Sequence, residues 1–233
     1  MLNSVFNFLG ELIFPTTCLG CGAERVWLCP ACTEQIKVKA RQVCPCCYCE
    51  SAGGRTCAKC LPNFPLTGLK VAALYAQNAL LPRAIKRFKY RFARSLAGSL
   101  GEVLGRAFPQ EDFWQQAVLV PVPLHFRRKF WRGFNQADLL AQVLSEQFKL
   151  PRQNLLKRVR YTLPQSRLKR TKRLQNLQKA FQLRSKQALP PSRLILVDDV
   201  ASTGATLREC AKVLRRAGAG EVWGVVLARG QFL

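Results

Sequence analysis

Two adjacent carboxylates, Asp198 and Asp199, stand directly before a loop of small and hydroxyl-bearing residues. The apolar run at 194–197 predicts a buried strand, and open α/β sheets bind ligands at the carboxyl ends of such strands. The loop leads into a predicted helix whose N-terminus favours an anion, and small side chains let backbone N–H groups approach a phosphate. The predicted phosphate-binding residues are Ala201, Ser202, Thr203, Gly204, Ala205 and Thr206.

The carboxylates and the loop must contact different parts of one ligand, because carboxylates that touched a phosphate would repel it. Carboxylates accept hydrogen bonds from neutral hydroxyls, and a sugar carries such hydroxyls beside its phosphate. We therefore predict that a ribose 5-phosphate group lies along this segment. No lysine follows Gly204, which excludes a Walker A nucleotide loop.

A second group of chemically active residues lies near the N-terminus, where ten of the 11 cysteines fall between Cys18 and Cys60. Such clustering indicates metal binding, and two Cys-x-x-Cys pairs complete a tetrahedral, structural zinc site. The eight predicted ligands are Cys18, Cys21, Cys29, Cys32, Cys44, Cys47, Cys57 and Cys60.

Spacing alone leaves several properties of the cysteine segment open. The four pairs allow one or two zinc ions, paired sequentially or cross-braced. Cys46 and Cys49 form an overlapping pair that is either spare or replaces Cys44 and Cys47. Reduced structural thiols or a redox centre are the alternatives to zinc. Cys210 lies among apolar neighbours on a predicted helix and is expected to be a small core residue.

The charge of the chain is strongly one-sided. Lys and Arg number 37 against 13 Asp and Glu, a formal net charge of +24, and no acidic residue occurs from Gln147 to Val197. Two four-thiolate zinc sites would lower this charge only to roughly +20. A field of this sign attracts polyanions, with nucleic acid as the obvious partner, although a merely solvated basic surface is the alternative.

Apolar periodicity predicts strands at 70–75, 117–122, 193–200 and 221–228, and helices within 80–104, at 135–148 and at 205–217. Strands that alternate with helices indicate an α/β fold with a parallel sheet. We predict two domains: residues 1–65, with the cysteines and a short amphipathic N-terminal helix, and residues 66–233, with the sheet. No run is long enough for a membrane span, and the N-terminus lacks the features of a signal peptide.

The segment 120–141 is basic and aromatic, with the sequence VPVPLHFRRKFWRGFNQADLLA. Its cations can neutralise a pyrophosphate or a nucleic-acid backbone, or they are solvated charges. His125 is a possible general acid, with a structural imidazole as the better supported interpretation. Asn135 is expected to cap the following helix. Phe130, Trp131 and Phe134 can stack on bases, although packing on the core is favoured. The four cations are Arg127, Arg128, Lys129 and Arg132.

The segment 194–206 resembles the 5-phosphoribosyl 1-pyrophosphate (PRPP) signature of type I phosphoribosyltransferases. The resemblance implies that Asp198 and Asp199 contact the ribose 2′ and 3′ hydroxyls and that Ser202 to Thr206 bind the 5′-phosphate. It also implies Mg²⁺ bound together with PRPP, and a pyrophosphate loop after the strand at 117–122.

Over nearly its whole length the chain resembles the ComF family of ComFC-like and GntX-like proteins. The resemblance is carried by the cysteine pairs, the segment 120–141, Lys89-Tyr90-Arg91 and later residues, whereas Phe92 departs from the glycine of many relatives. It implies a cytoplasmic protein with an N-terminal zinc finger and a C-terminal phosphoribosyltransferase fold. The later residues are Arg160, Thr162, Gln165, Arg173, Asn176 and Phe181.

Two functions follow from this resemblance. The first is a protein that handles single-stranded DNA during natural transformation, with a competence helicase as a possible partner, and that binds PRPP or a related phosphoribosyl ligand. The second is an active phosphoribosyltransferase that displaces pyrophosphate from PRPP with an unidentified amine, base or nucleic-acid acceptor. The basic stretch favours the first, and the intact acidic pair keeps the second open.

Overall fold

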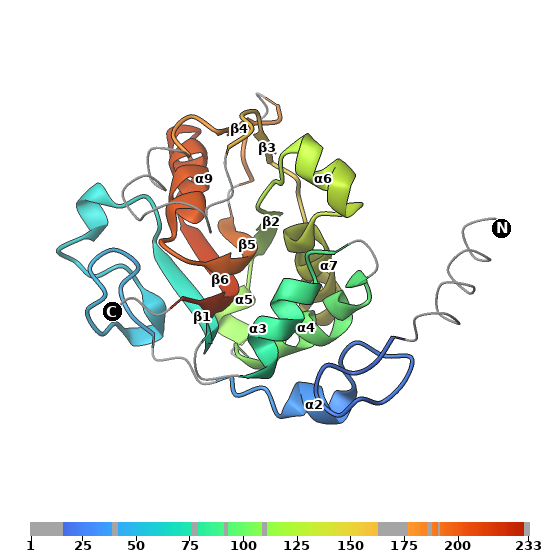
Figure 1. Ribbon diagram of the computed structural model, residues 1–233. Helices are drawn as coiled ribbons and strands as arrows, with labels where there is room; N and C mark the ends of the chain where they lie inside the picture. Colours follow the sequence, from blue (N-terminus) through green and yellow to red (C-terminus); the bar gives the residue numbers. More distant parts are fainter. Residues whose placement is uncertain are drawn as a thin grey trace.

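A computed structural model describes residues 16–38, 42–75, 79–90, 93–108, 111–162, 177–185, 188–190 and 192–230. Its centre is a four-stranded parallel sheet with the strand order β1-β6-β5-β2 (Figure 1). The predicted α/β fold with a parallel sheet is therefore confirmed. The strands are β1 (Gly68–Leu74), β2 (Ala117–Pro121), β5 (Arg193–Ala201) and β6 (Val222–Arg229).

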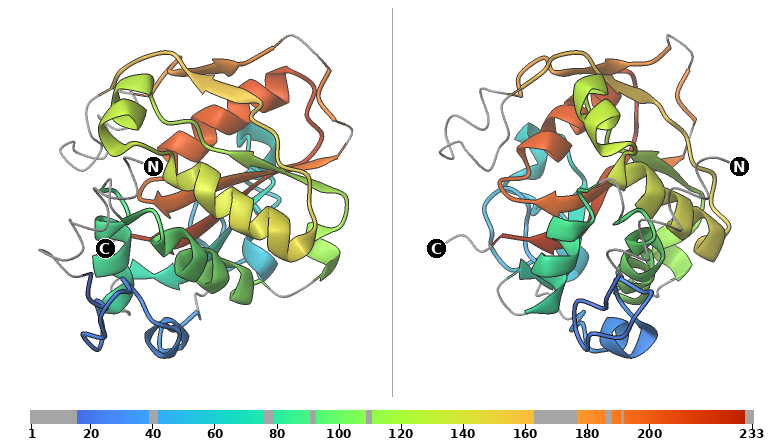
Figure 2. Two further views of the ribbon diagram at one scale, coloured as in Figure 1. Left: turned by 90° about the vertical axis from the view of Figure 1, so that its right-hand side faces the viewer. Right: turned by 45° about the vertical axis from the view of Figure 1, so that its right-hand side comes forward.

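Helices cover both faces of the sheet, which is why its strands are almost continuously apolar (Figures 1 and 2). On one face, α3 (Leu80–Arg87), α4 (Leu96–Arg106) and α7 (Gln136–Phe148) share a core with Ile195 and Val225. On the other face, α9 (Ala205–Arg216) shares a second core with Leu196. The predicted helix region at 80–104 is thus two helices.

Several shorter elements were not predicted from the sequence. A hairpin pairs β3 (Leu156–Arg158) with β4 (Phe181–Leu183), and a short helix α6 (Phe126–Arg132) follows β2. The remaining short elements are α2 (Pro30–Glu34), η1 (Ala52–Gly54), η2 (Leu61–Asn63) and α5 (Glu111–Trp114). No helix in the described residues is sufficiently long and apolar to span a membrane.

Some sequence predictions fall outside the described residues. These are the N-terminal amphipathic helix, together with Arg91, Phe92, Gln165, Arg173 and Asn176.

The first cysteine segment packs on the face of the sheet that α3 and α4 cover. The Ser99 hydroxyl donates to the carbonyl of Leu28 at 3.2 Å, and the Arg106 guanidinium donates to the carbonyls of Thr33 and Ile36, each at 3.0 Å. Leu28 and Ile36 are buried in the same core as α3 and α4. This segment therefore has no separate core of its own.

The second cysteine segment covers the edge strand β1. The Gln42 amide donates to the carbonyl of Val71 at 2.9 Å and accepts from its N–H at 3.1 Å, as a neighbouring strand would do. A sheet edge that is satisfied in this way is protected against pairing with another chain. The predicted domain boundary near residue 65 stays a prediction.

Candidate functional site

The two predicted acidic residues lie at the carboxyl end of β5, in the middle of the sheet. Asp199 is buried, and its Oδ2 lies 3.1 Å from the Nζ of Lys89. The Oδ1 of Asp198 accepts the backbone N–H of Asp199 at 2.9 Å. The pair is thus fixed by one ion pair and one local hydrogen bond.

The surroundings of Asp198 favour its protonated form. Burial, and then the negative charge of Asp199, raise the pKa of Asp198 to about 8, although Lys89 opposes the shift. A carboxyl group beside a like charge in a desolvated site keeps its proton longer. Asp198 is therefore poised to ionise when a ligand supplies hydrogen-bond donors or positive charge.

The predicted phosphate loop connects β5 to α9. Gly204 stands at the N-cap of α9 with φ of 69°, a left-handed conformation that favours glycine. The N–H groups in the first turn of a helix have no partner within the helix, and they point towards its N-terminal side. The loop thus brings Ser202 into one pocket with the acidic pair, whereas the hydroxyl oxygen of Thr203 accepts the N–H of Ala205 at 3.4 Å.

A pocket of about 610 Å³ opens in front of the acidic pair and is lined by residues from four stretches of the chain, at 89, 122–137, 158 and 198–206. Of the predicted residues, Asp198, Asp199, Ser202, Thr206, Arg128 and Arg132 line it. Arg127 instead lines an adjoining hollow of about 440 Å³, which Arg128 and Arg132 also border. Lys129 is exposed and lines neither space.

Lys89 and Arg158 also line this pocket, although sequence reasoning gave them no role there. Both belonged to recognisable stretches, the Lys-Tyr-Arg motif and the acid-free segment, but only the folded chain brings them to this pocket. Arg158 donates to the hydroxyl of the buried Thr162, and Arg128 donates to the carbonyl of the same residue at 2.7 Å. Thr162 thus orients two of the pocket's cations.

The pocket remains cationic despite its burial. Burial lowers the pKa of Arg158 to about 10 and also lowers the pKa of Arg132, yet a guanidinium with such a pKa stays protonated at neutral pH. Arg132 donates to Gln136 at 2.9 Å. Four cationic side chains therefore surround two carboxyl groups, a balance that suits a ligand with several phosphate charges.

Asn135 plays a different part from the predicted one. It stands at the N-cap of α7, but its side chain makes no capping hydrogen bond; its Nδ2 donates to the carbonyl of Val122 at 3.0 Å. This bond ties the start of α7 to the segment that leaves β2. Asn135 consequently shapes the pocket wall, because the residues from Val122 to Leu124 line the pocket.

His125 and the nearby aromatic residues divide between structural and exposed positions. His125 is buried, its Nδ1 accepts the N–H of Arg127 at 3.3 Å, and burial lowers its pKa, so it is a neutral cap of α6. Phe134 is buried with its ring centroid 5.6 Å from that of Phe88, as expected. The expectation of core packing is wrong for Phe130 and Trp131, which are 76% and 79% exposed.

The cysteines form two separate clusters of four, which resolves the open question of their pairing. Within each cluster the sulfur atoms lie within 4.8 Å of one another, and the pairing is sequential rather than cross-braced. Cys46 belongs to neither cluster, and Cys49 lies beside the second, with its Sγ 3.3 Å from that of Cys47. The clusters are Cys18, Cys21, Cys29 and Cys32, and Cys44, Cys47, Cys57 and Cys60.

The geometry of both clusters fits zinc. A tetrahedral ion with Zn–S bonds of about 2.3 Å places its sulfur ligands about 3.8 Å apart. Cys21 and Cys29 are separated by 3.7 Å between their Sγ atoms, and Cys47 and Cys57 by the same 3.7 Å. Zinc would cross-link each segment and add folding stability, with no open position for catalysis.

The two clusters share one backbone design. The N–H of Cys18 donates to Ala23 and that of Cys44 to Cys49, both at 2.8 Å, and the N–H of Cys29 points to the Sγ of Cys18 as that of Cys57 does to Cys44. Apart from the cysteines themselves, this repeat cannot be recognised in the amino-acid sequence. Cys210, by contrast, is buried in α9 as a core residue.

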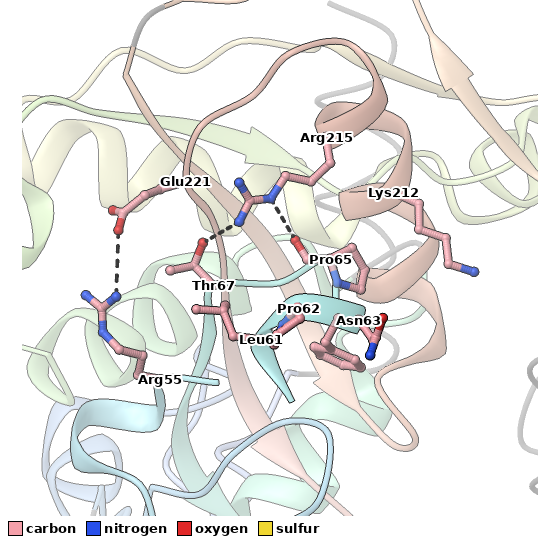
Figure 3. Close-up of a pocket in the computed structure, with 10 residues that line it drawn as sticks. Arg55, Leu61, Pro62, Asn63, Pro65, Thr67, Lys212, Arg215 and Glu221 are labelled. Atoms are coloured by element: carbon pink, nitrogen blue, oxygen red, sulfur yellow. Dashed lines mark hydrogen bonds and ion pairs between the residues drawn. The ribbon is translucent and has the colours of Figure 1, made fainter. Parts of the chain in front are cut away.

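A second large pocket, of about 620 Å³, lies at the opposite, amino-terminal edge of the sheet (Figure 3). Its walls are joined by Arg215, which donates to the carbonyl of Pro65 at 3.1 Å and to the hydroxyl of Thr67 at 3.2 Å. Glu221 faces Arg55 across 3.9 Å. These groups already bind one another, so the pocket is a seam between α9 and the start of β1.

The sequence is 37% identical to Competence protein F of Haemophilus influenzae over 215 residues, which covers 86% of this chain and 90% of that protein. It is 30% identical to the DNA utilization protein YhgH of Salmonella typhimurium over 206 residues, with 84% and 88% covered. It is 28% identical to Competence protein ComFC of Bacillus subtilis over 200 residues, with 82% and 79% covered. A scan against models of protein families gives no match.

Two solved structures share more distant similarity. One is the allosteric regulatory enzyme of purine biosynthesis, with a TM-score of 0.39 and 21% identity, covering 57% of this chain and 26% of that one. The other is a purine phosphoribosyltransferase from Pyrococcus horikoshii, with a TM-score of 0.31 and 17% identity, covering 69% and 78%.

Proposed function

Because the chain belongs to the ComF family, we propose that it binds a phosphoribosyl ligand, PRPP with Mg²⁺ or a close relative, and serves the handling of single-stranded DNA. The names of its relatives, competence proteins and DNA utilization proteins, support the second half of this proposal. The pocket in front of Asp198 and Asp199 supports the first half. A cytoplasmic location, where incoming strands arrive, is part of the proposal.

The observation that carries the ligand assignment is that one pocket is lined by the two carboxyl groups, by the hydroxyl residues Ser202 and Thr206, and by three arginines. Asp198 and Asp199 accept hydrogen bonds from the ribose hydroxyls, and the loop from Ser202 to Thr206 binds the 5′-phosphate through N–H and hydroxyl donors. Arg128, Arg132 and Arg158 face the pyrophosphate, and guanidinium groups suit such oxygens. Mg²⁺ would neutralise part of the charge on the same oxygens.

Lys89 has a distinct part in this arrangement. Its Nζ lies 3.1 Å from Asp199 Oδ2, and its positive charge lowers the pKa of Asp198 against the larger effect of burial. Lys89 therefore holds Asp199 in position and favours the ionised form of Asp198, which accepts hydrogen bonds from ribose hydroxyls. We place it as a positioning residue of the site.

An active transferase is the second candidate, favoured by the hollow that adjoins the pocket at Arg128 and Arg132. A bound acceptor would form a bond from its nitrogen or oxygen to C1 of the ribose as the bond from C1 to pyrophosphate breaks. The acceptor's proton would leave to water, and the released pyrophosphate would carry both bonding electrons. Pyrophosphate release that depends on an added acceptor distinguishes this candidate from simple binding.

Calorimetric titration of PRPP·Mg²⁺ into the zinc-loaded protein tests the proposal. We expect saturable binding, with weaker binding of ribose 5-phosphate alone, because the fragment lacks the pyrophosphate that faces the arginines. Absence of binding at millimolar PRPP would remove the ligand assignment. Binding of pyrophosphate as tightly as PRPP would remove the ribose contacts from it.

A further inference from the structure

Exposed hydrophobic side chains gather at one place on the surface. Five of the seven large hydrophobic residues that are exposed in the described part of the chain lie on α6 or just after β3, and the other two are Leu61 and Tyr90. Figure 1 shows α6 and β3 at the same end of the molecule. We call this surface the α6 face. The five residues are Phe126, Phe130, Trp131, Val159 and Tyr161.

Core packing does not account for the aromatic residues of α6. The helix has seven residues, none of them buried. It is maintained by its ends, through the His125 cap and Gly133, whose N–H donates to the carbonyl of Lys129 at 2.8 Å. A helix this short is marginal by itself, so its large exposed rings need a reason other than the stability of the fold.

Arginines lie among these rings. The guanidinium carbon of Arg127 is 5.6 Å from the ring centroid of Tyr161, and that of Arg128 is 5.7 Å from it. Arg127, Arg128, Trp131, Arg132 and Tyr161 line the hollow of about 440 Å³ next to the phosphoribosyl pocket. The hollow thus combines two aromatic rings with three cations.

Helical spacing arranges the side chains of α6 in two rows. Arg128 and Arg132 are four residues apart and both line the phosphoribosyl pocket, whereas Arg127 and Trp131 form the next row, towards Tyr161. Neither α6 nor the sequence from 113 to 137 contains an acidic residue. Residues 126–132 and 159–161, which form the α6 face and its hollow, therefore contribute cations and aromatic rings but no carboxylate.

We propose that the α6 face binds single-stranded nucleic acid, with bases stacked on Trp131 and Tyr161 and backbone phosphates next to Arg127 and Arg128. Aromatic rings interleaved with cations are the means by which proteins bind single strands without reading their sequence. The inference rests on the proposed role in DNA handling and names the surface that carries it. A second copy of this chain is a poor occupant, because its net charge of +24 repels the same face.

Tryptophan fluorescence offers a direct test, because Trp114 and Trp223 are buried and Trp131 is the most exposed of the four tryptophans. Unlabelled oligothymidylate should quench the emission of the wild-type protein as a base stacks on the indole. Trp131→Phe should lose most of this quenching yet bind a fluorescein-labelled oligothymidylate within about threefold of wild type in fluorescence anisotropy, because phenylalanine also stacks.

Removal of the rings gives the complementary test. Trp131→Ala and Tyr161→Ala should each weaken oligothymidylate binding about tenfold, with an unchanged salt dependence, because no charge is removed. Leu61→Ala is the matched control, since this exposed residue lies at the opposite edge of the sheet. Circular dichroism and zinc content verify that the variants are folded.

Three results would overturn the proposal. The first is wild-type affinity for oligothymidylate in the Trp131→Ala, Tyr161→Ala double variant. The second is a double variant that loses binding to vesicles of phosphatidylglycerol and phosphatidylcholine but keeps its affinity for oligothymidylate, which would make the face a membrane contact. The third is a double variant that loses self-association in sedimentation but keeps its affinity for oligothymidylate. Failure of PRPP binding would leave these measurements unaffected, so the two proposals fail separately.

Discussion

The pocket in front of Asp198 and Asp199 and the hollow on the α6 face both include Arg128 and Arg132 in their walls, but the two regions are built in different ways. In the pocket, charged side chains are oriented by specific partners: Lys89 by the Asp199 carboxylate and Arg128 by the carbonyl of Thr162. On the α6 face the rings of Trp131 and Phe126 are mostly exposed. Preorganised groups suit one ligand of fixed shape, whereas exposed rings and cations suit a flexible polymer of variable sequence.

The largest effect should come from loss of zinc, which should unfold the pocket and the α6 face together. The first cysteine cluster shares the core of α3 and α4, and the second segment covers β1. Because the metal supplies folding free energy, chelation or Cys29→Ser should abolish cooperative thermal unfolding and both binding activities.

Zinc content by atomic absorption and melting by circular dichroism measure this effect. Cys46→Ser is the control, because Cys46 belongs to neither cluster and its loss should leave two zinc ions per chain. A zinc-free protein that still binds PRPP and oligothymidylate would show that the cysteine clusters are dispensable for both regions.

The next effect should separate the two regions. Asp198→Asn combined with Asp199→Asn should weaken PRPP binding about 100-fold, because two charged hydrogen-bond acceptors are lost. Oligothymidylate binding should remain equal or become slightly tighter, since negative charge is removed near the face. Calorimetry and anisotropy on one preparation give both values, and unchanged PRPP affinity would refute the site assignment.

Substitution of Arg128, which lines both spaces, should weaken the binding of both ligands, but by a smaller factor than the double aspartate substitution weakens PRPP binding. Arg128 lines both the pocket and the hollow, so Arg128→Ala should weaken both ligands, each by about tenfold. Lys129→Ala removes the same charge from an exposed residue that lines neither space, and should change either affinity by less than about threefold. An Arg128 variant that affects only one ligand would break the proposed link.

The smallest expected effect is the pH dependence of PRPP affinity, which concerns only the pocket. The pKa of Asp198 is about 8, so the fraction that is ionised, and with it PRPP affinity, should rise severalfold between pH 7 and pH 9. Lys89→Met should move this rise to higher pH, because Lys89 lowers the pKa of Asp198. Asp198→Asn should show no such rise. Calorimetry across this range is the measurement, and oligothymidylate binding should lack the same inflection.

The raised pKa also predicts a cost in stability. Because Asp198 binds its proton more tightly in the folded protein than at its ordinary pKa of 3.8, its stabilising contribution is complete below that pH. The contribution is lost as pH rises towards 8. Asp198→Asn should therefore melt a few degrees higher than wild type at pH 9. An equal or lower melting temperature would indicate that Asp198 is not strained in this way.

The elements that could be predicted from the sequence are those that bury an apolar face. All four sheet strands were predicted, because a parallel sheet that is covered on both sides consists of long apolar runs. The helices α7 and α9 were predicted because each buries one apolar face. α6 buries no residue, and the strands of the β3–β4 hairpin have three residues each, so neither leaves a readable period.

The candidate site divides in the same way. Asp198, Asp199 and their loop are contiguous in the chain, so their chemistry could be predicted from local sequence. Lys89 and Arg158 reach the same pocket from distant segments, and only tertiary structure brings them there. The sequential pairing of the cysteines was equally undetermined, because the spacing of Cys-x-x-Cys pairs permits either arrangement.

A crystal structure of the zinc-loaded protein with PRPP·Mg²⁺ is the decisive test of the ligand assignment. We expect ribose hydroxyls within hydrogen-bond distance of Asp198 and Asp199, and the 5′-phosphate on the loop from Ser202 to Thr206. Electron density for the ligand elsewhere, with its phosphates on the α6 face or in the pocket between α9 and β1, would contradict it.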